Sequence, residues 1–374
     1  MKASMQKLLD DLNKRYTPPG AEKNVLVPYN EFDPVEMVPT SSYALSYLLG
    51  GGWRVGKLHE FFGPEHGGKT TLTFLALKDM FDHYQGRKAV IYCDIEHRFN
   101  PEWAEIMGLR RGDNLIVMQP SNAEAATDML HEMLMSQEFC AYAWDSVGAS
   151  ASTDEQKTFT DKQYGYGGVA NVMTRHVKTI APIANLFNAT GFYTNQLRAD
   201  MSGYNRPMTP GGHALKHEMS MRIYLRRGKD KYSEKTAEGD VQVGYPMVFK
   251  TVKNTYGPTP REQWSDFYFQ PSRWLDHVGF DHQKDLQRLG ILTGVFEQSS
   301  SWYYYKKDSP EEIKGNGRDA FFKALADANK EQEVADAVLK TLAASGSNEV
   351  EYVALDKDLA RPETEGPEID DPEV

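Results

Sequence analysis

A glycine-rich stretch between two apolar runs contains the residues best suited to chemistry. Its first eight residues fit the pattern G-x-x-x-x-G-K-[ST], and Thr71 follows them: Gly63, Pro64, Glu65, His66, Gly67, Gly68, Lys69, Thr70 and Thr71. Glycines allow the backbone N–H groups of such a loop to point at phosphate oxygens, and the positive end of a following helix adds to the attraction. The lysine reaches the β- and γ-phosphates, and the threonine after it ligates Mg²⁺. The loop therefore predicts a site for a nucleoside triphosphate with Mg²⁺.

An acidic residue at the end of a second apolar run can complete the metal shell. The run FCAYAWD ends in Asp145. Carboxylates at the C-terminal ends of strands line the sites of α/β proteins. An aspartate in this position can also cap a helix. Together with the phosphate loop, it leads us to expect that Asp145 shares the Mg²⁺ with Thr70.

Two further acids follow a third apolar run and can act on water. Asp94 closes the run AVIYCD, and Glu96 lies just past it. Hydrolysis needs a group that orients water on the γ-phosphate. Glu96 is the better candidate for the general base and Asp94 for a helper or structural role, although either can be a plain surface carboxylate.

The elements that would position these residues alternate between strand and helix through residues 40–270. Continuous apolar strands separated by helices are typical of a mostly parallel sheet covered on both faces. We therefore predict an α/β fold with a mostly parallel central sheet. Strands are expected over 57–63, 88–94, 114–119, 139–145 and 190–196, and helices over 70–84, 101–108, 122–137 and 168–188.

Two later β-rich runs, 219–227 and 245–254, are separated by a polar segment over 228–242. Their composition favours strands. We expect them to be antiparallel additions at one edge of the sheet.

Three segments are expected outside this core. Residues 1–39 combine a helix over 2–15, whose apolar residues share one face, with an extended stretch over 24–29. The sequence pattern changes over residues 271–345, where we expect a small α+β domain. The segment 346–374 is acidic and contains prolines, which predicts a disordered tail.

Charge and composition restrict the class of protein. The chain of 374 residues has a net charge of −11 and two cysteines, Cys93 and Cys140, both in apolar runs and expected to be buried. Residues 347–374 contain ten acids against two bases, whereas residues 198–229 contain seven bases against two acids. The basic segment is compatible with an anionic partner or with a solvated charged face. There is no signal-peptide core and no apolar run long enough to cross a bilayer, so we expect a cytoplasmic protein without a membrane partner.

Several motifs in this order extend the interpretation: GPEHGGKTT, DIEHRFNPEWAEIMGL, DNLIVMQP, WDSVGA, NQLR, GGHALK followed by RIYLRR, and VKN. The chain resembles the RecA family of ATP-dependent DNA recombinases, including its phage-encoded members, over essentially its whole length. The resemblance implies a DNA-dependent ATPase that forms helical filaments on single-stranded DNA and exchanges strands with a homologous duplex, in a bacterial cytoplasm or a phage-infected host. The phosphate-loop motifs alone leave open a ring-forming helicase or DNA motor on the same core.

The resemblance also implies roles for single residues of the nucleotide site. Glu96 matches the catalytic glutamate, and Gln196 of NQLR matches the glutamine that senses the γ-phosphate. Trp103 lies where the family has an aromatic residue that stacks on adenine, with a core or surface tryptophan as the alternative. Lys253 matches a lysine that reaches the ATP of the neighbouring subunit. A second lysine of the family pattern is replaced by Thr255.

Subunit and DNA contacts are implied in the same way. Lys216 and His217 fall at the subunit interface, where His217 replaces an apolar residue of the family pattern. Two loops, 152–170 and 199–213, are expected to grip DNA, with Met201 or Tyr204 as a wedge between bases. Single-strand-binding and mediator proteins are further candidate partners. The candidate DNA contacts are Arg175, Lys178, Arg198, Met201, Tyr204, Arg206, Gly211 and Gly212.

Overall fold

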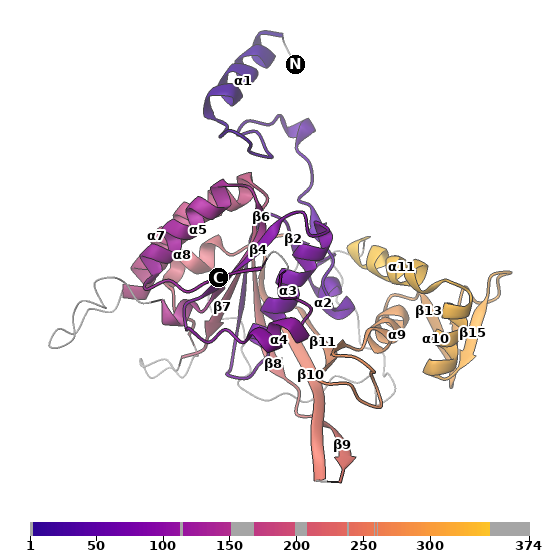
Figure 1. Cartoon of the computed structure of the whole chain (residues 1–374). Helices are drawn as coiled ribbons and strands as arrows, with labels where there is room; N and C mark the ends of the chain where they lie inside the picture. Colours follow the sequence, from indigo (N-terminus) through magenta and orange to yellow (C-terminus); the bar gives the residue numbers. More distant parts are fainter. Residues whose placement is uncertain are drawn as a thin grey trace. The chain divides into compact units, whose positions relative to one another are not determined.

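The computed structural model of the chain describes residues 3–112, 115–150, 168–198, 208–237, 239–257, 259 and 261–344 (Figure 1). The chain divides into two compact units. The first unit comprises Met1–Val38, Arg54–Glu65 and Lys69–Ile223, and the second comprises Pro39–Trp53, His66–Gly68 and Tyr224–Val374. The expected acidic tail, 346–374, lies outside the described residues.

Among its described residues, the first unit contains five parallel strands whose carboxyl ends lie at one edge of the sheet. Gly63 of β3 is aligned with Gln196 of β7, and Asp94 of β4 is aligned with Asp145 of β6. The residues predicted to handle the nucleotide therefore leave neighbouring strands at the same edge. This confirms the mostly parallel sheet. In spatial order the strands are β3 (Leu58–Gly63), β7 (Thr190–Gln196), β6 (Phe139–Asp145), β4 (Ala89–Asp94) and β5 (Leu115–Met118).

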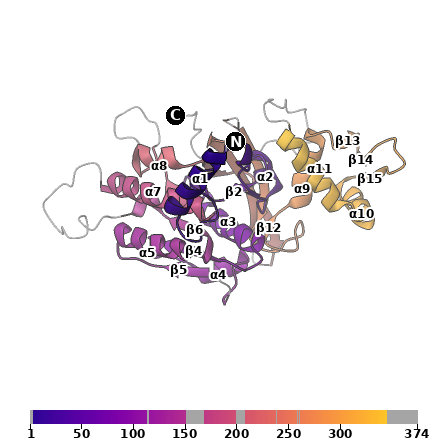
Figure 2. The same ribbon diagram turned by 90° about the horizontal axis from the view of Figure 1, so that it is seen from above.

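Helices pack against this sheet through apolar faces. Figures 1 and 2 show α5 and α7 side by side. Both contribute to one core with the strands, in which Leu130, Met173 and Ile180 pack with Tyr142 and Trp144. The expected helices are confirmed to within a few residues: α3 (Lys69–His83), α4 (Pro101–Ile106), α5 (Ala123–Met135) and α7 (Gly168–Leu186); α8 (Gly212–Glu218) and the short turn η2 (Val147–Ala149) were not expected.

The N-terminal segment differs from its prediction in one respect. Helix α1 (Ala3–Tyr16) forms, but the stretch 24–29 is not a strand. The amides of Val25 and Leu26 are bound by the side chains of Thr17 (3.1 Å) and Asn13 (2.8 Å), so they are not available for pairing with another strand. A short turn η1 (Tyr29–Glu31) and strand β1 (Met37–Val38) follow instead.

Antiparallel strands dominate the second unit. The first part of strand β10 (Gly239–Asn254) pairs with β9 (Tyr232–Thr236), and its later part pairs with β11 (Arg261–Tyr268). Strand β11 in turn pairs with β12 (Gly279–Phe280). The polar segment 228–242 was not expected to contain strands. Tyr232 anchors it, because its ring stacks on Tyr268 with centroids 5.4 Å apart. The remaining elements before this region are β2 (Trp53–Arg54), α2 (Tyr43–Leu48) and β8 (Met221–Arg227), which begins in the first unit and ends in the second.

The C-terminal part of the second unit has the α+β composition expected from its sequence. Phe296 and Phe321 lie at the centre of its apolar core, with Leu289, Leu325 and Val338 around them. Across the described part of the chain, no helix is both long and apolar enough to cross a membrane. Its elements are α9 (His282–Leu292), the antiparallel strands β13 (Phe296–Ser299), β14 (Trp302–Tyr305) and β15 (Ile313–Asn316), α10 (Arg318–Asp327) and α11 (Glu331–Ala344).

Candidate functional site

The phosphate loop connects β3 to α3 in a conformation that depends on glycine. Gly68 has φ +93°, and a Cβ atom at this position would lie 2.6 Å from Met247 Cε. The Lys69 ammonium group turns back over the loop and donates to the carbonyl oxygens of Gly63 (3.0 Å) and Pro64 (2.7 Å). Burial lowers the pKa of Lys69, while the negative charges of Asp145, Glu65 and Glu96 oppose this shift. A cation is thus held among acids at the start of α3.

Asp145 lies at the end of β6 and accepts hydrogen bonds on both carboxylate oxygens. Thr70 donates to Oδ2 at 3.3 Å, Tyr92 also donates to Oδ2, and Thr194 donates to Oδ1. Burial raises the pKa of Asp145, and the hydrogen bonds from Thr194 and Tyr92 limit the rise. A threonine hydroxyl beside a carboxylate is a donor set that suits Mg²⁺, which takes hard oxygen ligands and few of them from the protein.

Glu96 lies just beyond β4 and is bound by two residues that the sequence did not connect with each other. Its Oε1 accepts from the Ser146 hydroxyl and from the Gln196 amide at 3.3 Å. Its Oε2 lies 3.3 Å from the Arg98 guanidinium, and the Glu96 side chain is 18% exposed. The structure therefore brings the predicted general base and the predicted γ-phosphate sensor into direct contact.

The turn that carries Glu96 is fixed by Asp94. This carboxylate is 1% exposed and accepts from the amides of Arg98 and Phe99, both at 2.9 Å, and from the Gln119 side chain at 2.8 Å. All of these hydrogen bonds join Asp94 to other residues of the protein. The geometry supports the structural role for Asp94 rather than a part in catalysis.

Trp103 is placed beside the phosphate loop by a short helix. Asn100 caps α4 by accepting from the Trp103 amide at 3.0 Å. The Trp103 indole N–H in turn donates to the Thr71 hydroxyl at 3.2 Å. The ring is half-buried and next to α3, which is compatible with a contact to the base of a nucleotide.

A buried ion pair links β3 to β8, its neighbours hold the segment before α8, and sequence reasoning missed it. Glu60 is fully buried and paired with Arg222, which also donates to the Thr209 hydroxyl at 3.0 Å. Asn195, next to Gln196, donates to Glu60 at 2.8 Å and to the carbonyl of Pro210 at 2.9 Å. A buried charge pair within a strand pattern gives no periodic signal, so only the fold shows it.

The predicted DNA contacts fall in several places. Met201, Tyr204 and Arg206 lie outside the described residues, as does most of the loop 152–170. Arg198 is exposed, pairs through its backbone with Met208 and donates to the Gly148 carbonyl at 3.1 Å.

The remaining predicted DNA contacts lie on α7 and at the start of α8. Arg175 and Lys178 are exposed on α7, and Lys178 lines a pocket of about 410 Å³ with Lys57 and Asn185. Gly211 has φ +101° and precedes Gly212 at the start of α8, where a Cβ on Gly211 would lie 2.9 Å from Val147 Cγ1.

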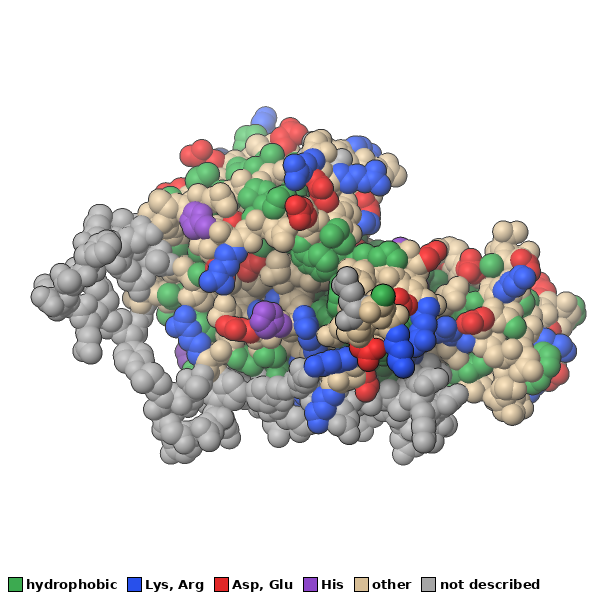
Figure 3. Space-filling model, turned by 60° about the horizontal axis from the view of Figure 1, so that its bottom comes forward, with side chains coloured by type: hydrophobic (Ala, Val, Ile, Leu, Met, Phe, Trp, Pro, Cys, Tyr) green, Lys and Arg blue, Asp and Glu red, His purple; other side chains and the backbone are tan. Residues whose placement is uncertain are grey.

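The residues predicted at the subunit interface lie on one helix and one strand. Lys216 and His217 lie in the last turn of α8, in the first unit. Lys253 lies near the end of β10, in the second unit. Figure 3 shows Lys and Arg side chains intermixed with Asp and Glu on one face of the molecule, so the net negative charge does not make the surface uniformly acidic.

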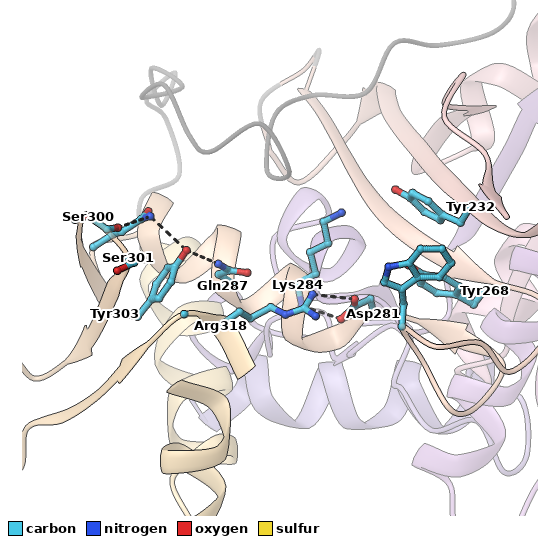
Figure 4. Close-up of a pocket in the computed structure, with 12 residues that line it drawn as sticks. Tyr232, Tyr268, Asp281, Lys284, Gln287, Ser300, Ser301, Tyr303 and Arg318 are labelled. Atoms are coloured by element: carbon cyan, nitrogen blue, oxygen red, sulfur yellow. Dashed lines mark hydrogen bonds and ion pairs between the residues drawn. The ribbon is translucent and has the colours of Figure 1, made fainter. Parts of the chain in front are cut away.

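A separate pocket of about 690 Å³ lies in the second unit, and the sequence assigned it no role (Figure 4). Tyr232 and Tyr268 line one side and Tyr303 the other. The ring of Trp274, which also lines the pocket, lies 6.0 Å from the ring of Tyr232. Two cations of this pocket already have acidic partners: Lys284 pairs with Asp266, and Arg318 lies 3.5 Å from Asp281. The charge of both cations is therefore balanced within the fold.

Comparisons with known proteins identify relatives of the chain. The family model of the RecA N-terminal domain matches residues 4–271. The chain is 31% identical to Protein RecA of Thermotoga neapolitana over 287 residues, which is 76% of this chain and 77% of that protein. It is 31% identical to Protein RecA of Streptomyces rimosus over 80% of this chain and 76% of the relative.

A third relative gives the same picture. Protein RecA of Thermus aquaticus is 32% identical over 274 residues, which is 72% of this chain and 76% of that protein. The match to the family model spans the phosphate loop, the acids at the strand ends and the second loop. The chain belongs to the RecA family of ATP-dependent DNA recombinases, which are DNA-dependent ATPases.

Proposed function

We propose that ATP binds on the carboxyl edge of the first unit's sheet, with its phosphates on the loop from Gly63 to Thr71. Lys69 neutralises the β- and γ-phosphates, and Trp103 contacts adenine. Thr70 and Asp145 would hold Mg²⁺, which would supply positive charge beside the phosphates. The observation that carries the proposal is the hydrogen-bonded cluster in which Thr70 binds Asp145 and Gln196 binds Glu96.

Glu96 is the general base in this proposal. A carboxylate placed beside the γ-phosphate can accept a proton from the attacking water, which is worth about 10²–10⁴-fold in rate. The Ser146 hydroxyl holds Oε1 and fixes the orientation of the carboxylate. Gln196 shares that oxygen, so a γ-phosphate that attracts the Gln196 amide releases Glu96 toward water.

Gln196 also begins the connection to DNA. Its backbone amide donates to the Asn195 side chain at 3.0 Å, and Asn195 binds the Pro210 carbonyl at 2.9 Å. The backbones of Arg198 and Met208 pair just beyond, at 2.8 and 2.9 Å. Both ends of the second loop are thereby tied to the strand that contacts the nucleotide. We infer that ATP binding sets the conformation in which this loop contacts DNA, with Arg175, Lys178, Arg198 and Arg206 on phosphates.

The active form is a helical filament of this chain on single-stranded DNA that takes up a homologous duplex. Lys253, Lys216 and His217 act across the subunit boundary in this arrangement. Helix α1 offers an apolar face to a neighbouring copy, since Met5 and Leu8 are 50% and 51% exposed. Single-strand-binding and mediator proteins would assist loading, in the bacterial cytoplasm or an infected host. The three relatives are RecA proteins, and no feature of the described residues favours a closed ring.

Sedimentation with a long single-stranded oligonucleotide and a slowly hydrolysed ATP analogue tests the proposal. We expect the native chain to sediment as a large polymer and Lys69→Ala to stay small. Electron micrographs of the same sample should show open helices. Closed rings would establish a motor instead, and a monomer under all conditions would refute the filament.

A further inference from the structure

The carboxylate of Asp145 is bound from both flanks by hydroxyl groups that no sequence motif singled out. Strand β6 lies between β4 and β7 in the sheet. Tyr92 of β4 donates to Oδ2 of Asp145, and Thr194 of β7 donates to Oδ1. The aspartate at the end of β6 is therefore held by one side chain from each neighbouring strand.

Both hydroxyl donors are fixed by their surroundings. Tyr92 is 2% exposed, and its ring packs against Phe74 and Phe99 with centroid distances of 5.0 and 5.3 Å. Thr194 is 1% exposed and β-branched, so its χ1 rotamer is restricted by the strand. Neither hydroxyl can turn to bulk water without moving the core. The two hydrogen bonds therefore define the plane of the Asp145 carboxylate.

The chemistry of these donors leaves the charge of Asp145 available. A hydroxyl donates one hydrogen bond but brings no positive charge, unlike an arginine or a lysine. Thr70, the candidate Mg²⁺ ligand on α3, reaches the same Oδ2 at 3.3 Å. The orientation of the carboxylate relative to the Thr70 hydroxyl is thus set before any cation arrives, while its negative charge can still attract one.

We propose that Tyr92 and Thr194 are positioning residues that orient Asp145 for the Mg²⁺ of the bound nucleotide. The inference rests on the proposed nucleotide site and goes beyond it, because it assigns metal affinity to two side chains that do not touch the metal. Partners of this kind typically contribute about 10–100-fold to metal affinity. A purely structural hydrogen bond would contribute to folding stability and leave the Mg²⁺ dependence unchanged.

The variants Tyr92→Phe and Thr194→Val remove one hydroxyl each and keep the shape of the side chain. Two matched controls lose a buried hydroxyl elsewhere in the same sheet. Tyr142→Phe acts on β6, where Tyr142 is bonded to Tyr193 at 2.9 Å, and Thr190→Val acts on β7, where Thr190 accepts from the Gly56 amide at 3.1 Å. Thr194→Ser keeps the hydroxyl and serves as the conservative rescue.

The measurement is equilibrium binding of a fluorescent ATP analogue as Mg²⁺ is titrated, which needs no turnover. We expect the half-saturating Mg²⁺ concentration to rise about tenfold in Tyr92→Phe and in Thr194→Val. It should rise further in the double variant and stay within about twofold of native in Thr194→Ser and in both controls. Binding of the analogue in EDTA should be the same for all variants.

The outcomes separate the inference from the proposed function. Native half-saturation in both folded variants would overturn the inference alone, as would an equal rise in the two controls. If Tyr92→Phe fails to fold, the half-saturating Mg²⁺ concentrations of Thr194→Val and Thr194→Ser test the inference, and equal values would overturn it. A native chain whose binding of the analogue does not depend on Mg²⁺ would overturn the proposed metal site and the inference with it.

Discussion

Two aspartates, one in each unit, are held by several hydrogen bonds but differ in the charge around them. Asp145 in the first unit accepts from the hydroxyls of Tyr92, Thr194 and Thr70. Asp285 in the second unit accepts from Ser265 at 2.8 Å and is joined by a cation, since Arg288 lies 3.7 Å away. Asp145 is half-buried and Asp285 is buried, and of the two only Asp285 has a guanidinium beside it among the residues that the structure describes.

The second cluster is complete within the fold. Arg288 also donates to the Trp264 carbonyl at 2.7 Å and lies 4.1 Å from the centroid of the Trp264 ring. Asp285 further accepts from the Ala44 amide at 3.2 Å and the Ser42 hydroxyl at 3.3 Å. Its role is to join α2, β11 and α9. Asp145, in contrast, accepts hydrogen bonds from neutral hydroxyl groups, and the cation near it is Lys69 of the phosphate loop, so in our proposal Mg²⁺ adds positive charge at this site.

The largest effect should come from Glu96, the proposed general base of the nucleotide site. In Glu96→Gln the amide oxygen can still accept hydrogen bonds from Ser146 and Gln196, but the carboxylate that would accept the proton is lost. We expect ATP hydrolysis to fall by about 10³-fold, while ATP and DNA binding persist. Steady-state hydrolysis together with filter binding of DNA measures both. Unchanged hydrolysis would show that another group activates the water.

Substituting both aspartates tests the comparison itself. Asp145→Asn should reduce hydrolysis by about 100-fold or more, because the site loses the charge that attracts Mg²⁺. It should still fold, since the amide oxygen can accept on one side and the amide NH2 group can donate to a hydroxyl oxygen on the other. Asp285→Asn should change hydrolysis by less than about threefold, because its partners are structural groups of the second unit. Equal losses in the two variants would erase the distinction between the clusters.

The pH dependence of stability provides a sharper test of Asp285. Burial raises the pKa of Asp285 to about 6 from its ordinary value of 3.8. Since the folded state holds this proton more tightly than the unfolded state, the stabilising contribution is present below about pH 4 and is lost as the pH rises to about 6. Relative to Asp285→Asn, the native chain should lose about 2 kcal/mol over this range.

Urea unfolding of the native chain and of Asp285→Asn at several pH values between about 4 and 7 measures this change. The difference between their free energies of unfolding should move in favour of the variant as the pH rises. A difference that does not vary with pH would mean that Arg288 keeps Asp285 ionised throughout the range.

The smallest effect is expected at the edge of the nucleotide site. Arg98 is 80% exposed and pairs with Glu96 at 3.3 Å. Exposed ion pairs contribute at most about 1 kcal/mol, so Arg98→Ala should change the hydrolysis rate by less than about fivefold. Arg111→Ala, which removes a 72% exposed arginine paired with Glu105, is the matched control. A loss comparable to that of Glu96→Gln would place Arg98 in the catalytic machinery.

Much of this site could be predicted from sequence because its parts are local. The phosphate loop is one continuous motif, and Asp145, Glu96 and Gln196 follow apolar strands whose ends must share an edge in a parallel sheet. The hydroxyls of Tyr92 and Thr194 could not be found in this way. Their role depends on which strands flank β6, and a single sequence does not give strand order.

The errors in the fold have equally physical causes. The stretch 24–29 has a strand-like composition, but Asn13 and Thr17 bind its amides. Helix α9 escaped prediction because much of its buried face is polar, with Asp285, Gln287 and Arg288 all nearly inaccessible. Hydrophobic periodicity detects apolar burial and gives no sign of a buried polar network.

The most direct test of the nucleotide site and its coupling to DNA is ATP hydrolysis by the native chain and by Lys69→Ala, each with and without single-stranded DNA. We predict that DNA raises the native rate severalfold or more and that Lys69→Ala is inactive in both conditions. A native rate that does not change with DNA would contradict the coupling of the nucleotide site to DNA. Hydrolysis by Lys69→Ala at the native rate would contradict a nucleotide site on this edge of the sheet.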